Sequence, residues 1–213
     1  MNAKWKEQLE QHRSQRREDI ISSAQDLLLE RGLSAVTLKD IVEHCGISKV
    51  TLYKYFRSYE EIIFEVQMNV LRTWMEGIYR VAAKGGSGLE KLRSLLEHMV
   101  SHSEQNPNAI RFIAIFDAYY RDNYPTAELE QRYRSFLKGG PHPFFALLQQ
   151  GVDDGSIRSD IDLNELTYTL SNIVIATLQR MILRGQLLKQ DQGVEPSAIL
   201  EHMVAMVLTY VKA

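Results

Sequence analysis

The chain has 213 residues, of which 45% are hydrophobic and 24% are charged, and its formal net charge is −2. This composition is that of an ordinary globular protein rather than a disordered chain. No apolar run approaches the roughly 18 residues of a membrane span. The first residues, MNAKWKEQLEQHRSQRRED, lack the apolar core of a secretory signal. A single cysteine, Cys45, excludes an intramolecular disulfide, so we expect a cytoplasmic protein with no membrane partner.

Helical periodicity runs through nearly the whole chain, and no strand-like alternation of any length interrupts it. Glycine and proline mark most of the expected helix ends. The short connections favour an up-and-down packing of helices, which makes the predicted fold class all-α. In chain order, the expected helices cover about 20–31, 37–45, 48–56, 58–83, 89–105, 107–120, 127–137, 144–152, 163–188 and 196–212.

The stretch TLKDIVEHCGISKVTLYKYFRSY, residues 37–59, predicts two short helices joined by a tight turn. Thr37 is a good cap for the first helix, Gly46 ends it, and Ser48 is a good cap for the second. The second helix is expected to bury Leu52 and Phe56. It would present a set of polar and small side chains outward, namely Lys49, Val50, Thr51, Lys54 and Tyr55.

The charge of this stretch is locally positive. From His44 to Ser58 the chain has three cations and no carboxylate. A net charge of −2 argues against indiscriminate coating of nucleic acid, but specific binding depends on the local sign of charge. A short acid-free helix after a glycine turn is what docking in a DNA groove requires.

Residues from about Arg17 to Val66 resemble the DNA-binding domain of the TetR family of bacterial transcription regulators. The resemblance rests on a leading helix that ends at Glu30-Arg31-Gly32, on Gly46-Ile47-Ser48, and on the run from Thr51 to Phe56. It implies an N-terminal three-helix helix-turn-helix domain, residues 1–57, followed by a larger helical ligand-binding and dimerisation domain, residues 58–213. It also implies a repressor that a small-molecule inducer releases from palindromic double-stranded DNA, without enzymatic activity or cofactor.

The predicted DNA contacts divide into phosphate contacts and base contacts. Hydroxyls and backbone N–H groups at the two helix starts are expected to hold phosphate, and the resemblance adds a tyrosine hydroxyl; these residues are Thr37, Ser48 and Tyr53. Side chains expected to reach base edges are Lys49, Thr51, Lys54 and Tyr55, with Val50 against a thymine methyl. Lys39 matches a family position that sometimes reaches a base. Surface lysines without a DNA role are the alternative for Lys39 and Lys54, and a partly buried ring is the alternative for Tyr53.

One position departs from the family pattern. Tyr59 stands where the family usually has a lysine, so one cationic phosphate contact is expected to be missing, although the tyrosine hydroxyl or the local backbone could still reach phosphate. Arg57 and the N-terminal arginines, Arg13, Arg16 and Arg17, are candidates to compensate. The arm that carries these three arginines is expected either to contact DNA or to be disordered in the free protein.

Aromatic and apolar side chains of the larger domain are candidates to line an inducer cavity. The candidate ligand-binding residues are Trp74, Ile78, Phe112, Phe116, Asp117, Tyr120, Phe144 and Tyr168. Plain core packing is the alternative for the apolar members. Asp117 lies in an apolar run, where a buried carboxylate needs a partner; it faces a ligand, an arginine or solvent.

The last two helices each carry a broad apolar face, on 163–182 and 199–211, and the resemblance implies a homodimer formed through them. A monomer core is the alternative. His98 and His102 have helical spacing for a metal, but no clear third ligand accompanies them, so no metal site is predicted. The rival hypothesis, an all-helical enzyme or metal-binding protein with an incidental helix-turn-helix, has no catalytic constellation in its support.

Overall fold

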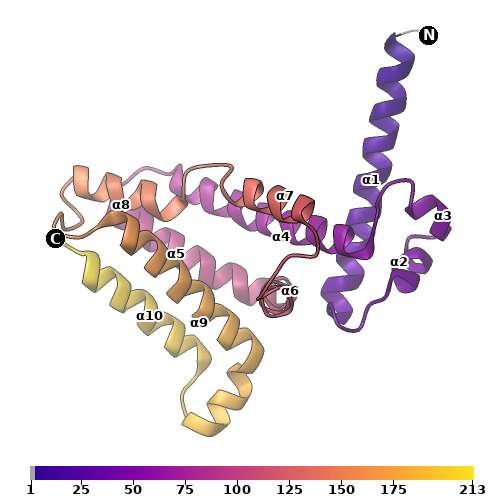
Figure 1. Cartoon of the computed structure of the whole chain (residues 1–213). Helices are drawn as coiled ribbons and strands as arrows, with labels where there is room; N and C mark the ends of the chain where they lie inside the picture. Colours follow the sequence, from indigo (N-terminus) through magenta and orange to yellow (C-terminus); the bar gives the residue numbers. More distant parts are fainter. Residues whose placement is uncertain (1–2) are drawn as a thin grey trace. The chain divides into compact units, whose positions relative to one another are not determined.

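The computed structural model describes residues 3–213, and within them it contains ten helices and one isolated antiparallel bridge between Ile157 and Lys212 (Figure 1). The predicted all-α class is confirmed, and each expected helix is present. The helices are α1 (Ala3–Arg31), α2 (Leu38–His44), α3 (Lys49–Leu52), α4 (Tyr59–Ala82), α5 (Gly88–Gln105), α6 (Pro107–Tyr119), α7 (Ala127–Leu137), α8 (Pro143–Asp153), α9 (Leu163–Gln192) and α10 (Pro196–Val211).

Two helices differ most in length from the prediction. The first begins at Ala3, so the N-terminal arm is helical, and its residues 7–16 are exposed to solvent. The arm has no apolar stripe from which a helix could be predicted, but its Glu, Gln, Lys and Arg residues are all good helix formers. The second difference is α3, which contains only four residues instead of the nine predicted.

The chain divides into two compact units. The first comprises residues up to Val70 together with Phe112–Phe136, and the second comprises Leu71–Arg111 and Leu137–Ala213. The predicted boundary between functional domains, at residue 57, falls inside the first unit and stays a prediction.

The core of the first unit begins with α1, α2 and α3. Ala24 and Leu28 of α1, Ile41 of α2, and Leu52 and Phe56 around α3 are at most 1% exposed. Burial of this apolar surface supplies the main driving force for holding such short helices in place. A second group in this unit consists of aromatic rings whose centroids lie 4.8–6.0 Å apart: Phe64, Phe116, Tyr120, Tyr124 and Tyr133.

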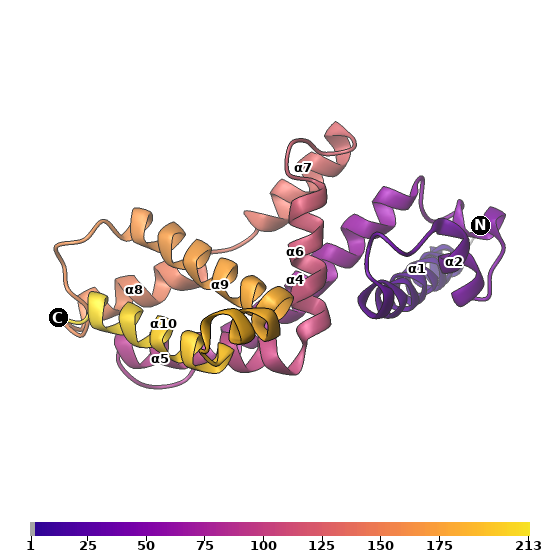
Figure 2. The same cartoon turned by 90° about the horizontal axis from the view of Figure 1, so that it is seen from below.

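The second unit is built on α5, α8, α9 and α10, which lie side by side (Figures 1 and 2). The start of α5 is fixed by the turn that follows α8. There, the Gly88 N–H donates to Asp154 Oδ2 at 2.7 Å and the Leu89 N–H donates to Ser156 Oγ at 3.1 Å. Gly88 also meets Gly151 of α8 so closely that a Cβ atom would have no room. Two glycines therefore allow the backbones of α5 and α8 to touch.

Among the described residues, no single helix is long and apolar enough to cross a membrane. Only the pair α9 and α10, taken together, meets that length and composition, and the two helices are bent by 104° at the break between them.

We expect Gly88→Ala to lower the free energy of unfolding by about 3 kcal/mol, because overpacking against a backbone cannot be relieved by a rotamer change. A Cβ on Gly88 would lie 2.2 Å from the Gly151 backbone nitrogen. Urea denaturation followed by circular dichroism measures the change. Gly85→Ala is the matched control, because nothing among the described residues lies within 4 Å of its Cβ position. Equal stability of the two variants would contradict the packing described.

Candidate nucleic-acid interface

The turn between α2 and α3 is built by local backbone rules. Gly46 has a φ of +62°, in the left-handed region that glycine adopts without strain. The Gly46 N–H donates to Glu43 O at 3.2 Å, and the Ile47 N–H donates to Val42 O at 3.2 Å. Ser48 then caps α3, because its Oγ accepts the Thr51 N–H at 3.1 Å. The predicted glycine turn and serine cap are confirmed.

Beyond Leu52 the helix tightens instead of ending abruptly. The N–H groups of Lys54 and Tyr55 donate to the carbonyls three residues back, at 3.1 and 2.9 Å. The Phe56 N–H donates to Leu52 O at 3.0 Å. This tight last turn is why the α-helix is shorter than predicted. We call residues 48–56 the recognition segment.

The outer face of the recognition segment carries the predicted contact residues. Lys49, Val50, Tyr53 and Lys54 are exposed, Val50 by 71% of its surface, while Thr51 and Tyr55 are half-buried. The Lys49 ammonium lies 5.8 Å from the centre of the Tyr53 ring, an attractive cation–π arrangement. The segment therefore presents cations, a hydroxyl-bearing ring and a small apolar side chain to solvent.

The start of α2 is closed by a capping box, in which Thr37 and Asp40 exchange hydrogen bonds. The Asp40 carboxylate accepts the Thr37 N–H at 2.8 Å and the Thr37 hydroxyl, and the Thr37 Oγ accepts the Asp40 N–H at 3.3 Å. These hydrogen bonds to Thr37 hold the pKa of Asp40 below its usual value. A carboxylate thus sits where phosphate was predicted, and the Thr37 hydroxyl proton is already donated. The Thr37 contact stays a prediction, and its hydroxyl could donate to phosphate only if this capping box opened.

Two further predicted contact residues have acidic neighbours. Lys39 pairs with Glu43 one turn on, at 3.6 Å, with both side chains well exposed. Arg57 donates to Glu128 of α7 at 2.6 Å, and both of these side chains are also exposed. Exposed pairs of this kind are weak, so each cation remains exchangeable with phosphate.

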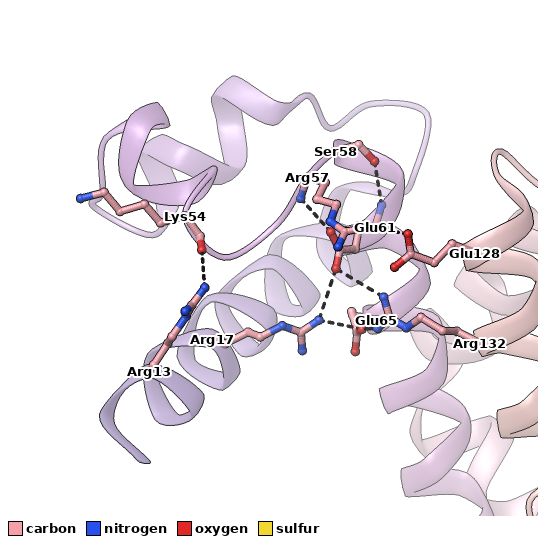
Figure 3. A network of polar contacts seen from close by, with 9 residues as sticks. All are labelled: Arg13, Arg17, Lys54, Arg57, Ser58, Glu61, Glu65, Glu128 and Arg132. Carbon is pink, nitrogen blue, oxygen red and sulfur yellow. Dashed lines mark hydrogen bonds and ion pairs between the residues drawn. The ribbon is translucent and has the colours of Figure 1, made fainter. Parts of the chain in front are cut away.

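Two arginines of α1, Arg13 and Arg17, hold the recognition segment in place (Figure 3). The sequence did not predict this role for them. Arg13 donates to the Lys54 carbonyl at 3.2 Å, and the Arg17 guanidinium lies 4.8 Å from the centre of the Phe56 ring. Arg17 also pairs with Glu65 of α4 at 2.7 Å. One feature of the sequence could have predicted these contacts. Glu61 and Glu65 are like charges four residues apart, and such a pair destabilises a helix unless cations from another part of the chain lie beside it.

Tyr59 does not act as the replacement phosphate contact that the sequence left open. Its hydroxyl donates to Val36 O at 2.7 Å, inside the loop between α1 and α2. Burial raises the pKa of Tyr59 to about 12. The hydroxyl therefore fastens the start of α4 to this loop.

Cys45 is half-buried beside α1, where its Sγ lies 3.9 Å from Ile20 O. Burial raises the pKa of the thiol above its usual value. Because the thiolate is the reactive form, this environment favours packing over redox chemistry.

The candidate ligand-binding residues are distributed over both units. Phe112 and Phe116 are buried in the first unit, Tyr120 is half-buried there, and Asp117 is exposed. The second unit holds the other four, with Trp74, Ile78 and Phe144 buried and Tyr168 exposed. The exposure of Asp117 agrees with the solvent-facing alternative among the three that the sequence left open. The shared cavity stays a prediction.

His98 and His102 of α5 lie near Trp74, and burial lowers the pKa of both histidines. The Trp74 and His102 rings are stacked, with centroids 6.4 Å apart. Within residues 3–213, no group of three or more His, Cys, Asp or Glu side chains is arranged to hold a metal ion.

Two short helices joined by a glycine turn, the second with an exposed acid-free face, have the arrangement of helix-turn-helix DNA-binding proteins, whose second helix lies in the major groove. The family model described as bacterial regulatory proteins, tetR family, matches residues 20–66. A curated relative, the HTH-type transcriptional repressor KstR2 of Rhodococcus jostii (strain RHA1), is 34% identical over 159 residues, which cover 71% of this chain and 72% of the relative. The chain belongs to the TetR family and is a DNA-binding transcriptional regulator.

Solved structures share the fold over nearly the whole chain. The transcriptional regulator FadR from Bacillus subtilis in complex with stearoyl-CoA has a TM-score of 0.67 and 18% identity, covering 90% of this chain and 97% of that one. The ketosteroid transcriptional regulator KstR2 of Mycobacterium tuberculosis has a TM-score of 0.60 and 21% identity, covering 93% and 95%. The larger helical part, which the sequence motif did not reach, therefore also has the fold of this family.

We expect Tyr59→Phe to lower the free energy of unfolding by about 1 kcal/mol at pH 8, because one internal hydrogen bond is lost. The raised pKa makes the contribution of this hydroxyl fully present below about pH 10. That contribution is lost as the pH rises toward 12. The wild-type protein should therefore lose stability more steeply than the variant above pH 10.

Urea denaturation at pH 8 and pH 11 measures both effects. Tyr53→Phe is the control, since it removes a hydroxyl from an exposed ring and should change stability by less than about 0.5 kcal/mol. Parallel pH profiles for the wild type and Tyr59→Phe would refute the internal role of the hydroxyl.

Proposed function

We propose that the chain is a repressor that binds a palindromic operator as a homodimer and leaves it when a small molecule binds to the larger helical part. The observation that carries this proposal is the recognition segment, whose exposed side chains are cationic, aromatic or small. The name of the curated relative KstR2, a transcriptional repressor, supports the sign of regulation.

The exposed face of the recognition segment separates naturally into two tasks. Ser48 at the helix start, Tyr53 with its exposed hydroxyl, and Arg57 just after the segment are proposed to contact phosphate. The side chains proposed to read base edges are Lys49, Thr51, Lys54 and Tyr55, with Val50 against a thymine methyl. Thr37 and Lys39 at the start of α2 are proposed as flanking contacts.

The homodimer is supported by apolar side chains that α9 and α10 leave exposed. Between 46% and 67% of the surface of each is accessible, although both helices also carry a buried face; they are Ile173, Leu183, Leu187, Met206 and Tyr210. Exposed apolar surface concentrated on two helices is typical of a protein–protein contact. A hollow of about 610 Å³, lined by residues of both helices and by the loop before α9, lies on the same surface.

The charge on α9 favours a second copy of the same chain. Acidic residues lie at its start, among them Asp162 and Glu165, and exposed arginines, Arg180 and Arg184, lie in its second half. A two-fold axis perpendicular to α9 would reverse the direction of the partner helix, so that each acidic end would approach a basic half. We call the predicted DNA-binding domain, residues 1–57, the head of the chain; two heads related in this way can meet successive major grooves.

The inducer is proposed to bind in the larger helical part and to present hydrogen-bonding groups to buried polar atoms. Among the described residues, five atoms of this kind have no hydrogen-bond partner; Gln67 Oε1 lies in the first unit, and the other four lie in the second: Trp74 Nε1, His98 Nε2, His142 Nδ1 and Thr167 Oγ1. Buried polar groups normally have partners. The structural relatives, described with stearoyl-CoA or as a ketosteroid regulator, favour a lipid-derived molecule.

We expect Lys49→Ala and Tyr53→Phe each to weaken operator binding about fivefold or more, since each removes a proposed contact worth about 1 kcal/mol or more. The duplex is one that the wild-type protein selects from a random-sequence library, and fluorescence anisotropy measures affinity and stoichiometry. Two chains, or a multiple of two, should bind each site. Tyr59→Phe is the matched control, because its hydroxyl is bound internally. If both contact variants bind within twofold of wild type, the assigned interface is wrong.

We expect stearoyl-CoA to release the protein from the selected duplex, lowering the apparent affinity at least tenfold at saturation. A ligand can do this only if it binds the DNA-free state more tightly than the DNA-bound state. The same titration should respond less to coenzyme A alone, which lacks the acyl chain. Unchanged affinity with stearoyl-CoA would remove this class of long-chain acyl thioester from consideration, while leaving the DNA contacts intact.

A further inference from the structure

Charged side chains from α1, α4 and α7 form one cluster in the first unit (Figure 3). At its centre are the carboxylates of Glu61 and Glu65 on α4. Arg17 of α1 lies 3.7 Å from Glu61 and 2.7 Å from Glu65. Arg132 of α7 lies 3.3 Å from Glu61 and also pairs with Glu65. Each carboxylate is thus shared between a cation of the head and a cation of α7.

The central carboxylates are largely removed from solvent. The side chains of Glu61 and Glu65 are 15% and 11% exposed, whereas Arg17 and Arg132 are about one-third exposed. Charges at this depth are screened less than surface charges, and each needs its partner cations to offset desolvation. Arg132 therefore fixes α7 to α4.

The cluster continues to the recognition segment along two routes. On one side Arg17 packs over Phe56, the last core residue of the segment. On the other side Glu61 accepts the backbone N–H of Arg57 at 2.7 Å. The backbone that carries Arg57 is therefore held by the same carboxylate that Arg132 contacts.

The side chain of Arg57 is held by a second acid of α7. Its Nη1 donates to Glu128 Oε2 at 2.6 Å, across 71 residues of sequence. Glu128 lies four residues before Arg132, on the same face of α7, so the buried ion pairs of Arg132 position the exposed carboxylate of Glu128. By contrast, the exposed pairs Arg134–Glu130 of α7 and Lys39–Glu43 of α2 each join residues within one helix.

A carboxylate and a phosphate present similar oxygen acceptors to a guanidinium, and two anions held on one exposed guanidinium repel each other. We propose that the Glu128 carboxylate binds the Arg57 guanidinium in place of a DNA phosphate. It thereby acts as an intramolecular brake, which lowers the affinity for the operator. The inference rests on the proposed phosphate contact of Arg57. DNA binding breaks the Arg57–Glu128 pair, and any shift of α7 that withdraws Glu128 frees Arg57 for DNA.

The alternative arrangement gives the opposite sign. If Glu128 held Arg57 in the orientation that phosphate requires, its loss would weaken binding instead of strengthening it. The sign of the effect therefore separates a competing carboxylate from an orienting one.

The test is Glu128→Gln in the full-length protein, measured by fluorescence anisotropy on the duplex selected by the wild type. We expect affinity to rise about threefold per bound head, the scale of one exposed ion pair. Glu130→Gln is the matched control: it removes the same charge two residues along α7, from a side chain that pairs with Arg134 at 2.8 Å. That variant should bind as the wild type does.

A double-mutant cycle with Arg57→Ala completes the experiment. Arg57→Ala alone should weaken binding, and Glu128→Gln should add nothing in that background. The brake is overturned if Glu128→Gln weakens binding or leaves it unchanged, if Glu130→Gln strengthens binding equally, or if the gain persists without Arg57. Lys49→Ala tests the proposed DNA interface independently, because the contact of Lys49 is with Tyr53 and not with the cluster. If Lys49→Ala weakens binding, the interface stands and the Glu128 variants test the brake alone.

Discussion

Burial of Leu52 and Phe56 is the interaction on which the DNA-binding face depends. A helix of four residues has no stability of its own, because nucleation costs more than so few hydrogen bonds return. The two side chains, each at most 1% exposed, fix α3 and its tight last turn on the core formed with α1 and α2. The orientation of Lys49, Val50 and Tyr53 toward solvent follows from that anchoring.

The polar contacts around the recognition segment fix its orientation, which apolar packing alone does not. Apolar contacts hold the recognition segment down, but they are not directional. Ion pairs and hydrogen bonds, such as Arg13 to the Lys54 carbonyl and Glu61 to the Arg57 backbone, have preferred geometries. The head and α7 consequently share one set of charges, so a movement of α7 changes the surroundings of the recognition segment without altering its core.

Local rules made most of the fold predictable from the sequence. Gly46, Ser48, Pro107 and Pro196 mark turns and helix starts through backbone preferences that act within a few residues. The same locality explains why the exposure of Lys49, Val50 and Lys54 could be predicted, whereas Thr51 and Tyr55, also expected to face outward, are half-buried.

Interactions that depend on distant residues were not predictable in this way. Nothing in the sequence pairs Arg57 with Glu128, 71 residues away, and nothing indicates that Tyr59 reaches Val36. The capping box at Thr37 is local and could have been found, since Asp40 stands three residues on. The inducer-binding residues are the hardest to predict from the sequence, because an aromatic side chain that fills a core has the same sequence pattern as one that lines a cavity.

Tyr59 has a consequence for how binding responds to ionic strength. The family resemblance implies a lysine at this position, whereas here the hydroxyl is committed to Val36. In the proposed dimer each DNA-binding domain would then make one cationic phosphate contact fewer than the family pattern, so the dimer would make two fewer. The dependence of log affinity on log salt becomes shallower by about 1.8, since each phosphate contact adds about 0.9 to the slope. Occupancy of the operator would then vary less when the ion content of the cell rises or falls.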